Sequence, residues 1–202
     1  STPVFISASD SEKGLYFSSI QPEFLFHGER EDLPYCVLSE CTWGITDQTD
    51  PVFLTTLLAK TPQTRWIFSG QIPPEATLDK WEGIVLNRDE MTAYAGSVPM
   101  AQAAKALLKK GVSWIIITLD KDGALLITLD GIRPYPAEKD GDYPLGCGDA
   151  FLSGLLLGLT QKKPIEHCLH PALAAAAIVL QVPAALSEKL CQLKPRTTSE
   201  PQ

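Results

Sequence analysis

Four consecutive residues, Gly146-Cys147-Gly148-Asp149, place two glycines and a carboxylate directly before an apolar run that ends at Leu159. The run is long enough for about three helical turns, so the glycines fall where a helix begins. Backbone N–H groups at a helix start lack intrahelical partners and lie at the positive end of the helix dipole, which attracts anions such as phosphate. Glycine also lets a ligand approach the backbone closely. Asp149 would then suit a general base that deprotonates a hydroxyl attacking that phosphate.

The same four residues also fit an ordinary turn followed by an acidic residue in the first helical turn, and that arrangement needs no ligand. The segment does not match the dinucleotide-binding fingerprint, because Phe151 stands where the third glycine belongs. This mismatch argues against a Rossmann-type dehydrogenase. The segment is not a Walker A loop either, because no Gly-Lys-Ser/Thr follows.

A second polar pair, Asn87 and Glu90, follows the apolar run 81–86. Residues three apart in the first turn of a helix lie on one side of it. Their amide and carboxylate oxygens are the kind of ligand that hydrated Mg²⁺ accepts. The pair also has the pattern of a capping box, in which Asn87 caps the helix and Glu90 closes the box. The sequence leaves both interpretations open.

Short β-prone segments alternate with helical segments along most of the chain. The predicted strands are 4–8, 14–18, 35–38, 65–69, 81–86, 113–119, 123–128 and 132–135, and the predicted helices are 51–60, 97–110, 150–159 and 171–180. The first two strands read as a hairpin, and Asp50 with Pro51 marks the start of the first helix. The alternation predicts an α/β domain with a largely parallel central sheet. Ligands of such sheets bind beyond the carboxyl ends of the strands, where Asn87 and Thr118 are expected.

Residues 146–151 resemble the C-terminal signature of the ribokinase-like (PfkB) carbohydrate kinases, Asp-Thr-x-Gly-Ala-Gly-Asp-x-Phe. Two further motifs occur in the order of that family. Residues 87–90 resemble its Asn-x-x-Glu motif, and residues 118–123 resemble its Thr-x-Gly-x-x-Gly motif with Asp120 in place of the first glycine. The resemblance implies the ribokinase-like fold, a three-layer sandwich with a largely parallel central sheet. It also implies that the N-terminal hairpin is a partial small β lid.

In that family the glycine-rich segment forms an anion hole and its aspartate is the catalytic base. The resemblance therefore implies that Asp149 takes a proton from the substrate hydroxyl, while the backbone N–H groups of Gly146, Cys147 and Gly148 neutralise the migrating phosphoryl group. Cys147 stands where the family has alanine. A thiol at a helix start can have a lowered pKa, so we expect Cys147 to be either the most reactive cysteine or a small buried hydrophobe.

The other two motifs carry the metal and nucleotide roles that the resemblance implies. Asn87 and Glu90 would organise Mg²⁺ and phosphate through water. Thr118 and Gly123 would line the ATP site. Asp120 is not assigned a role, because a carboxylate near phosphates would repel them.

The resemblance predicts a kinase that transfers the γ-phosphoryl group of ATP to a hydroxyl of a sugar or nucleoside. Ribose, a hexose, a nucleoside and a vitamin precursor are all compatible acceptors. The alternative is a catalytically impaired pseudokinase or interaction protein, because the N-terminal sugar contacts of the family do not precede the hairpin. Pro144 and Leu145 also replace the family's threonines, which questions activation by a monovalent cation. A fragment, a processed chain and a naturally shortened protein all fit a chain that begins at Ser1.

Composition narrows the class of protein. The 202 residues are 45% hydrophobic and 20% charged, which predicts one soluble globular domain with a substantial core. The net charge of −7 and the pI of about 4.9 argue against nucleic acid and anionic membranes as partners. Five cysteines without a Cys-x-x-Cys pair predict a reduced, cytoplasmic protein. The longest apolar runs, 150–159 and 171–180, are shorter than the roughly 20 residues that span a bilayer.

We expect three parts along the chain. Residues 1–30 form the partial lid, residues 31–193 form the nucleotide-binding α/β domain, and residues 194–202 form a flexible tail. Lid strands in the resembled family often pair between subunits, so a homodimer through these strands is an expectation of the resemblance.

Overall fold

The computed structural model describes residues 6–10, 15–19, 35–47, 50–139 and 141–181. The chain divides into two compact units, Ser1–Pro34 and Tyr35–Gln202. In the first unit, β1 (Ile6–Asp10) and β2 (Leu15–Ser19) pair antiparallel, so the predicted hairpin is confirmed. The tail predicted for 194–202 lies outside the described residues.

The described part of the second unit contains a six-stranded sheet in the order β3-β4-β5-β6-β7-β8. The strands are β3 (Trp43–Thr46), β4 (Arg65–Ser69), β5 (Gly83–Asn87), β6 (Trp114–Thr118), β7 (Ala124–Thr128) and β8 (Gly131–Tyr135). Strands β3 to β6 are parallel, whereas β7 and β8 join antiparallel at one edge. The predicted, largely parallel sheet is therefore confirmed.

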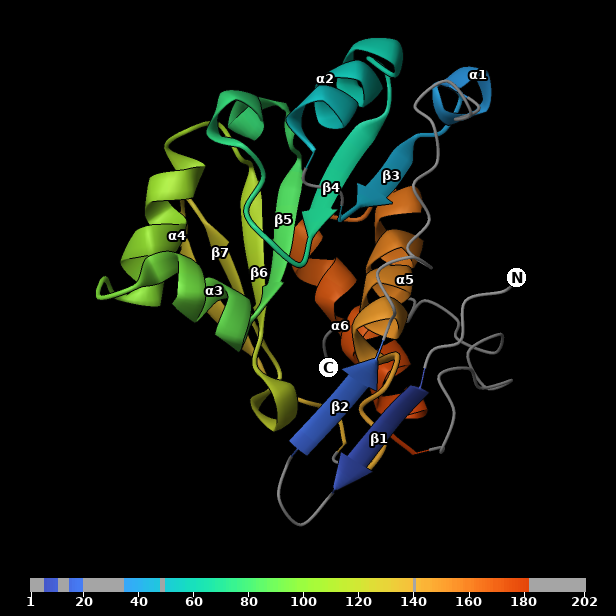
Figure 1. Ribbon diagram of the computed structural model, residues 1–202, viewed down its shortest axis with the longest axis vertical. Coiled ribbons are helices and arrows are strands. Elements are labelled where there is room, and N and C mark those ends of the chain that lie inside the picture. The colour runs from blue at the N-terminus through green and yellow to red at the C-terminus, as the bar shows by residue number, and fades with distance from the viewer. Residues whose placement is uncertain (1–5, 11–14, 20–34, 48–49, 140, 182–202) are drawn as a thin grey trace, which may run out of the picture. The chain divides into compact units, whose positions relative to one another are not determined.

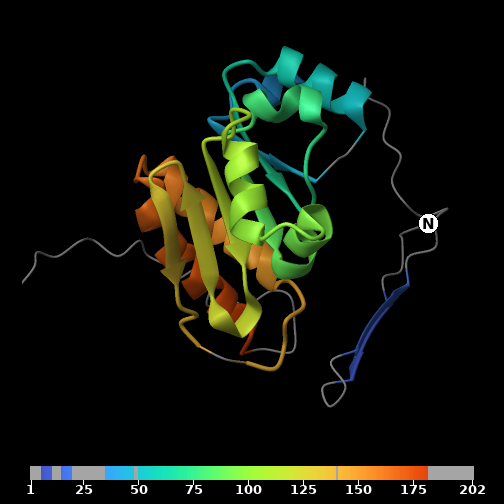
Figure 2. The ribbon, with the colours of Figure 1, turned by 90° about the vertical axis from the view of Figure 1, so that its left-hand side faces the viewer.

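Helices cover both faces of this sheet (Figures 1 and 2). On one side lie α2 (Pro51–Lys60), α3 (Arg88–Ala95) and α4 (Met100–Leu108), and on the other lie α5 (Cys147–Thr160) and α6 (Ile165–Val179). Alternation along the strands fills both interfaces. Ile84 packs in the cluster that includes Leu107 of α4, while its neighbour Val85 packs in the cluster that includes Leu155 of α5. The three-layer arrangement is confirmed.

The first predicted strand of this unit is wrong. Residues 35–38 form the short helix α1 (Tyr35–Leu38), and the edge strand is β3 instead. A four-residue apolar run has no periodicity that separates strand from helix. The strand that was missed alternates Trp43 and Ile45, which both pack against the core shared with α5 and α6, with Gly44 and Thr46. A Cβ at Gly44 would overlap the indole ring of Trp66 on β4, so packing explains this glycine within a strand.

Three predicted helices have different bounds. The helix expected over 150–159 is α5, which begins earlier, at Cys147, and ends at Thr160. The helix expected over 97–110 is α4 (Met100–Leu108), with Pro99 as its N-cap. The helix expected from Pro171 begins at Ile165 and contains Pro171 inside it. The predicted start at Pro171 is therefore wrong, although a proline inside a helix forgoes one backbone hydrogen bond. Helix α2 has the predicted bounds, and its N-cap Asp50 accepts hydrogen bonds from the N–H groups of Val52 and Phe53 at 2.8 and 3.3 Å.

Helices α5 and α6 pack with almost no space between their backbones. A Cβ on Gly154 would overlap the carbonyl of Pro171, and one on Gly158 would press on Cys168. These two glycines therefore serve tight helix packing. None of the helices in the described ranges combines the length and apolar character that crossing a bilayer demands.

We expect Gly154→Ala to lower the free energy of unfolding by about 1–3 kcal/mol, because the added methyl meets the backbone of α6, which cannot move aside cheaply. Alanine is otherwise favoured over glycine inside a helix by about 1 kcal/mol. Gly148→Ala, whose added Cβ meets nothing within 4 Å, is the matched control and should leave stability unchanged or raised. Urea denaturation followed by circular dichroism measures both. Equal stability of the two variants would contradict the packing argument.

Candidate active site

The start of α5 presents unpaired backbone donors beside an exposed carboxylate. Gly146 is the N-cap at φ +83° and ψ 0°, a left-handed conformation that favours glycine, and no side chain caps the helix there. The N–H groups of Gly148 and Asp149 have no acceptor among the described residues. The Asp149 side chain is exposed and forms no ion pair with any described residue. A ligand could therefore reach both the donors and the carboxylate.

One predicted donor of the anion hole is occupied. The N–H of Cys147 donates to the carbonyl of Pro144 at 3.1 Å. The position of Gly148 is open, because a Cβ there would meet no atom within 4 Å. Of the three predicted donors, the Cys147 N–H alone has an acceptor among the described residues, and the N–H of Asp149, which was not predicted, is a further available donor.

The thiol of Cys147 is half-buried against α6. Its Sγ lies 3.5 Å from the Tyr143 carbonyl and 3.8 Å from the Ala176 carbonyl. Burial raises the pKa of the Cys147 thiol to about 11. The prediction of a lowered pKa and a reactive thiolate is wrong, and the alternative, a small buried side chain, describes Cys147 better. Cys36 and Cys41 are the exposed cysteines among the described residues.

Asn87 and Glu90 form a complete capping box at the start of α3. The Asn87 side chain accepts from the Glu90 N–H at 2.8 Å, and the Glu90 Oε2 accepts from the Asn87 N–H at 2.7 Å. Burial raises the pKa of the Glu90 carboxyl, the hydrogen bond from Asn87 opposes this, and the charge of Asp89 adds to it. The capping interpretation is confirmed, while the Mg²⁺ role stays a prediction. The box uses only one carboxylate oxygen and leaves Oε1 outside it.

Thr118 is the last residue of β6, and Gly123 directly precedes β7. Thr118 is paired in register with Asn87 of β5, and its hydroxyl is 3.4 Å from the Leu86 carbonyl. Gly123 adopts φ +93°, and a Cβ there would overlap the carbonyl of Tyr135. Backbone conformation and packing thus explain Gly123 without any ligand. The structure places the predicted metal pair and the predicted nucleotide segment next to one another.

Sequence reasoning did not single out Arg88, which joins these two segments. Its Nη2 donates to the Asp122 carboxylate at 2.6 Å and to the Leu119 carbonyl at 3.2 Å. The residues of the ion pair are 34 positions apart in the chain. No local pattern could have indicated this contact.

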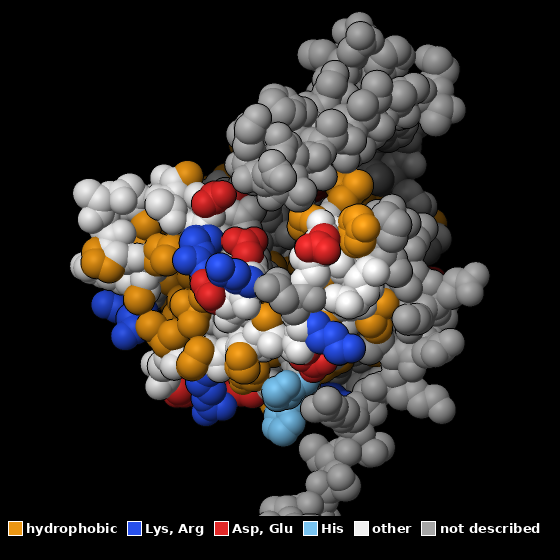
Figure 3. Space-filling view, turned by 90° about the horizontal axis from the view of Figure 1, so that it is seen from below, with side chains coloured by type: hydrophobic (Ala, Val, Ile, Leu, Met, Phe, Trp, Pro, Cys, Tyr) orange, Lys and Arg blue, Asp and Glu red, His pale blue; other side chains and the backbone are white. Residues whose placement is uncertain are grey.

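The start of α5 lies at the same end of the sheet as the carboxyl ends of β5 and β6, whose last residues are Asn87 and Thr118 (Figure 1). The opposite end of the unit confirms this orientation. There a cavity of about 500 Å³ is lined both by Thr160, the last residue of α5, and by Arg65 and Trp114, the first residues of β4 and β6. Figure 3 shows the end that carries the candidate site, where acidic and basic side chains lie side by side.

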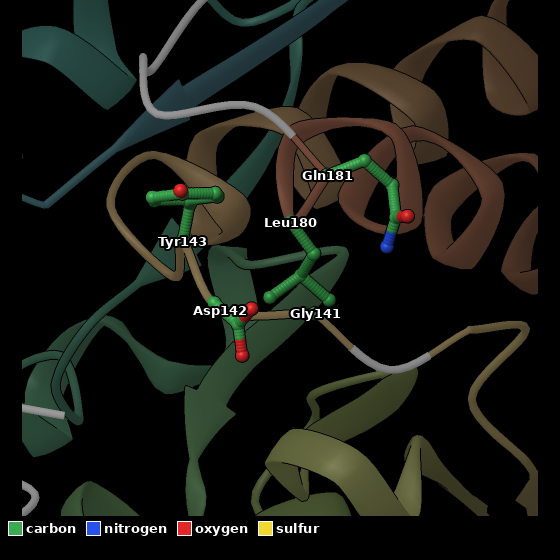
Figure 4. Close-up of a pocket in the computed structure, with 5 residues that line it drawn as sticks. All are labelled: Gly141, Asp142, Tyr143, Leu180 and Gln181. Carbon is green, nitrogen blue, oxygen red and sulfur yellow. The ribbon is translucent and has the colours of Figure 1, made fainter. Parts of the chain in front are cut away.

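A second cavity, of about 320 Å³, lies beside the segment that leads into α5. It is lined by Gly141, Asp142, Tyr143, Leu180 and Gln181 (Figure 4). The Tyr143 N–H donates to the Leu180 carbonyl at 3.3 Å, so the segment is held against the end of α6. Sequence reasoning did not single out the residues that line this cavity.

Comparison with known proteins now adds to this geometry. A model of the pfkB family of carbohydrate kinases matches residues 48–189. The chain belongs to this family. The 1-phosphofructokinase of Escherichia coli K12 is 33% identical over 100 residues, which cover 46% of this chain and 32% of that protein. The aminoimidazole riboside kinase of Salmonella typhimurium is 36% identical over 85 residues, which cover 42% and 27%. The matches span only about a third of these curated relatives.

Solved structures of ribokinases show the same fold. Ribokinase from Thermotoga maritima superposes with a TM-score of 0.76 at 22% identity, covering 92% of this chain and 64% of that one. Arabidopsis thaliana ribokinase, solved with ribose and ATP, gives 0.69 at 20% identity, covering 85% and 61%. The ribokinase-like α/β fold is thereby confirmed, and the chain spans less than two thirds of these structures.

We expect iodoacetamide at pH 8 to modify Cys36 and Cys41 well before Cys147. With a pKa of about 11, the Cys147 thiol is ionised in roughly one molecule in a thousand at that pH, and only the thiolate reacts. Peptide mass spectrometry over a time course measures the order, and full unfolding in urea before labelling is the control that should equalise the three. Modification of Cys147 first would show that the helix dipole outweighs burial.

We expect Glu90→Gln to gain thermal stability over the wild type as the pH rises from 4 to 7. Burial raises the pKa of Glu90 in the folded protein above its value in the unfolded chain. The protonated carboxyl therefore contributes to the free energy of unfolding at a pH below the unfolded pKa, and this contribution is lost as the pH rises through the folded pKa. Glutamine carries no charge and still closes the capping box. Differential scanning fluorimetry measures the trend. Glu90→Ala, which opens the box, should be less stable at both pH values, and a pH-independent difference for Glu90→Gln would contradict the assignment.

Proposed function

We propose that this chain is an ATP-dependent phosphotransferase, or the nucleotide-binding part of one, acting on a hydroxyl of a sugar or nucleoside. One observation carries the proposal: an uncapped helix start places free N–H groups beside the exposed carboxylate of Asp149. Membership of a carbohydrate kinase family supports it. Relatives named for phosphofructokinase and riboside kinase activity support the substrate class.

In the proposed reaction, Asp149 accepts the proton of the acceptor hydroxyl while that oxygen bonds to the γ-phosphorus of ATP and the bond to the ADP oxygen breaks. The N–H groups of Gly148 and Asp149 donate to the oxygens of the transferred group, where the α5 dipole adds positive potential. Cys147 contributes its N–H only when the Pro144 carbonyl releases it. Gly146 sets the left-handed turn that aims these donors.

Asn87 and Glu90 are proposed to hold a hydrated Mg²⁺ through their side-chain oxygens. The donor set fits, because Mg²⁺ keeps several waters and needs few protein oxygens, and Glu90 Oε1 stands outside the capping box. When bound, Mg²⁺ would neutralise phosphate charge. The described residues contain no group of three or more His, Cys, Asp or Glu side chains placed to hold a metal by themselves.

The nucleotide is proposed to lie along Thr118 and Gly123, with residues 31–193 as the nucleotide-binding domain and 1–30 as a partial lid. The register of Thr118 beside Asn87 supports this placement, since both close the carboxyl ends of neighbouring parallel strands. Arabidopsis ribokinase, which shares the fold, was solved with ribose and ATP.

A second candidate is a protein that binds ATP without transferring phosphate. The hydrogen bond from Cys147 N–H to the Pro144 carbonyl favours it, because it removes one donor from the anion hole. The chain also spans only 64% of the Thermotoga ribokinase structure.

We expect Asp149→Asn to lower the rate of phosphoryl transfer by about 10²–10⁴-fold, since the amide cannot take the acceptor proton. Affinity for MgATP should stay within a few-fold. ADP release with a panel of sugars and nucleosides measures the rate, and calorimetry measures binding. Asp130→Asn, an exposed carboxylate in the turn after β7, is the control and should behave as wild type. Undiminished turnover would remove Asp149 from the mechanism, and wild-type ATP binding without turnover would favour the second candidate.

A further inference from the structure

The segment of residues 118–123, here termed the nucleotide loop, is held from outside by one side chain. We propose that Arg88 is a positioning residue that fixes the nucleotide loop for MgATP and neutralises part of its negative charge. This inference rests on the proposed function and deepens it, because it adds a determinant of nucleotide affinity outside the three motifs.

Arg88 reaches the nucleotide loop from the first position of α3. Its Nη2 donates to the Asp122 Oδ2 at 2.6 Å and to the Leu119 carbonyl at 3.2 Å. The Leu119 N–H in turn donates to the Gly123 carbonyl at 2.7 Å, which closes the loop on itself. Arg88 therefore grips the loop at two points, one near each end.

The loop conformation is not one that its own backbone favours. Asp120 adopts φ +52°, in the left-handed region that glycine adopts freely and other residues rarely enter. It begins the 3₁₀ turn η4 (Asp120–Asp122), which follows Leu119 and ends at Asp122, the two residues bonded by Arg88. Backbone hydrogen bonds from the Asp122 N–H to the Leu119 carbonyl and from the Gly123 N–H to the Asp120 carbonyl also hold this turn. The two bonds from Arg88 add an external hold to these local ones.

Charge gives the second reason. The loop carries two carboxylates, Asp120 and Asp122, against one cation, Lys121. Nucleotide phosphates approaching the loop would be repelled by this excess. The Arg88 guanidinium lies at hydrogen-bonding distance from Asp122 and offsets its charge.

The contact between Arg88 and Asp122 should affect the conformation of the loop more than the free energy of unfolding of the whole unit. Arg88 and Asp122 are 42% and 57% exposed in their side chains, and such exposed ion pairs add little to the free energy of unfolding. The Nε–H of Arg88 is buried with no partner among the described residues, which disfavours the placement of the guanidinium. The two hydrogen bonds to the loop must therefore provide the free energy that keeps the Arg88 guanidinium in this position.

Arg88 also fixes the nucleotide loop relative to the proposed metal pair. It follows Asn87 directly and belongs to the helical turn that the Asn87–Glu90 capping box closes. The backbone pairing of Asn87 with Thr118 joins the same two segments at the carboxyl ends of β5 and β6. Together these links set the spacing between the groups proposed to meet Mg²⁺ and those proposed to meet ATP.

The test compares MgATP affinity, by calorimetry, in the wild type and in Arg88→Gln, Arg88→Lys, Asp122→Asn and the double variant Arg88→Gln/Asp122→Asn. Arg88→Gln should weaken binding about 10-fold, with kcat within about 2-fold and an unchanged melting temperature. Arg88→Lys should fall between, because it keeps the charge but not the planar fork. The double variant should bind more tightly than Arg88→Gln alone, since the repelling carboxylate is gone.

Lys110→Gln is the matched control, because Lys110 forms a 2.6 Å ion pair with Glu75 away from the site. It should bind MgATP as the wild type does. Wild-type affinity in Arg88→Gln would overturn the inference, and a double variant no better than Arg88→Gln would overturn its electrostatic half.

Amide hydrogen exchange without nucleotide separates this inference from the proposed function. Amides of residues 119–123 should exchange about 10-fold faster in Arg88→Gln than in the wild type or Lys110→Gln. Unchanged exchange overturns the positioning role whether or not ATP binds. A wild type that does not bind MgATP overturns the proposed function, and faster loop exchange in Arg88→Gln would then support only the hold on the loop.

Discussion

The parallel pairing of β5 with β6 is the constraint on which the candidate site depends. Their interiors are almost completely buried, and the two sides of each strand pack into different helical layers. A slip of one residue would exchange the layers that every side chain enters, so the register is strongly specified. That register sets Asn87 opposite Thr118. The start of α3 and the start of the nucleotide loop are therefore adjacent because the core is packed this way, before any ligand is considered.

The elements that could be predicted from the sequence are those whose signals are local. Asp50 and Pro51 define the start of α2, and β4 has the predicted bounds, because caps and buried runs act within a few residues. The predictions that were wrong concern elements whose boundaries are not marked by a local sequence signal. Residues 35–38 form helix α1 rather than the predicted strand, because four apolar residues carry no period that separates the two. Helix α6 begins at Ile165, after the N-cap Pro164, rather than at the predicted Pro171.

The candidate site divides in the same way. The family resemblance placed Asn87, Thr118 and Asp149 at helix and strand ends, and the structure puts them at one end of the sheet. Two properties depended on tertiary contact and could not be foreseen. Burial against α6 raises the pKa of Cys147, although its place at a helix start suggested the reverse. Arg88, at the start of α3, pairs with Asp122, in the turn between β6 and β7, and no local sequence pattern around either residue indicates this ion pair.

The net negative charge of the chain opposes the binding of a polyphosphate at this end of the sheet, so local positive potential would have to outweigh it. The net charge is −7, and Asp89, Asp120 and Asp122 lie in the segments that face the proposed nucleotide. Few side-chain cations offset them, so the positive potential has to come from backbone N–H groups, a helix dipole and a bound cation. Helix α5 suits this task because Gly146 leaves its start uncapped by any side chain, whereas the start of α3 is closed by its own capping box. The two helix starts are therefore not equivalent: the start of α5 leaves backbone donors without a side-chain partner, whereas the start of α3 satisfies its own donors through Asn87 and Glu90.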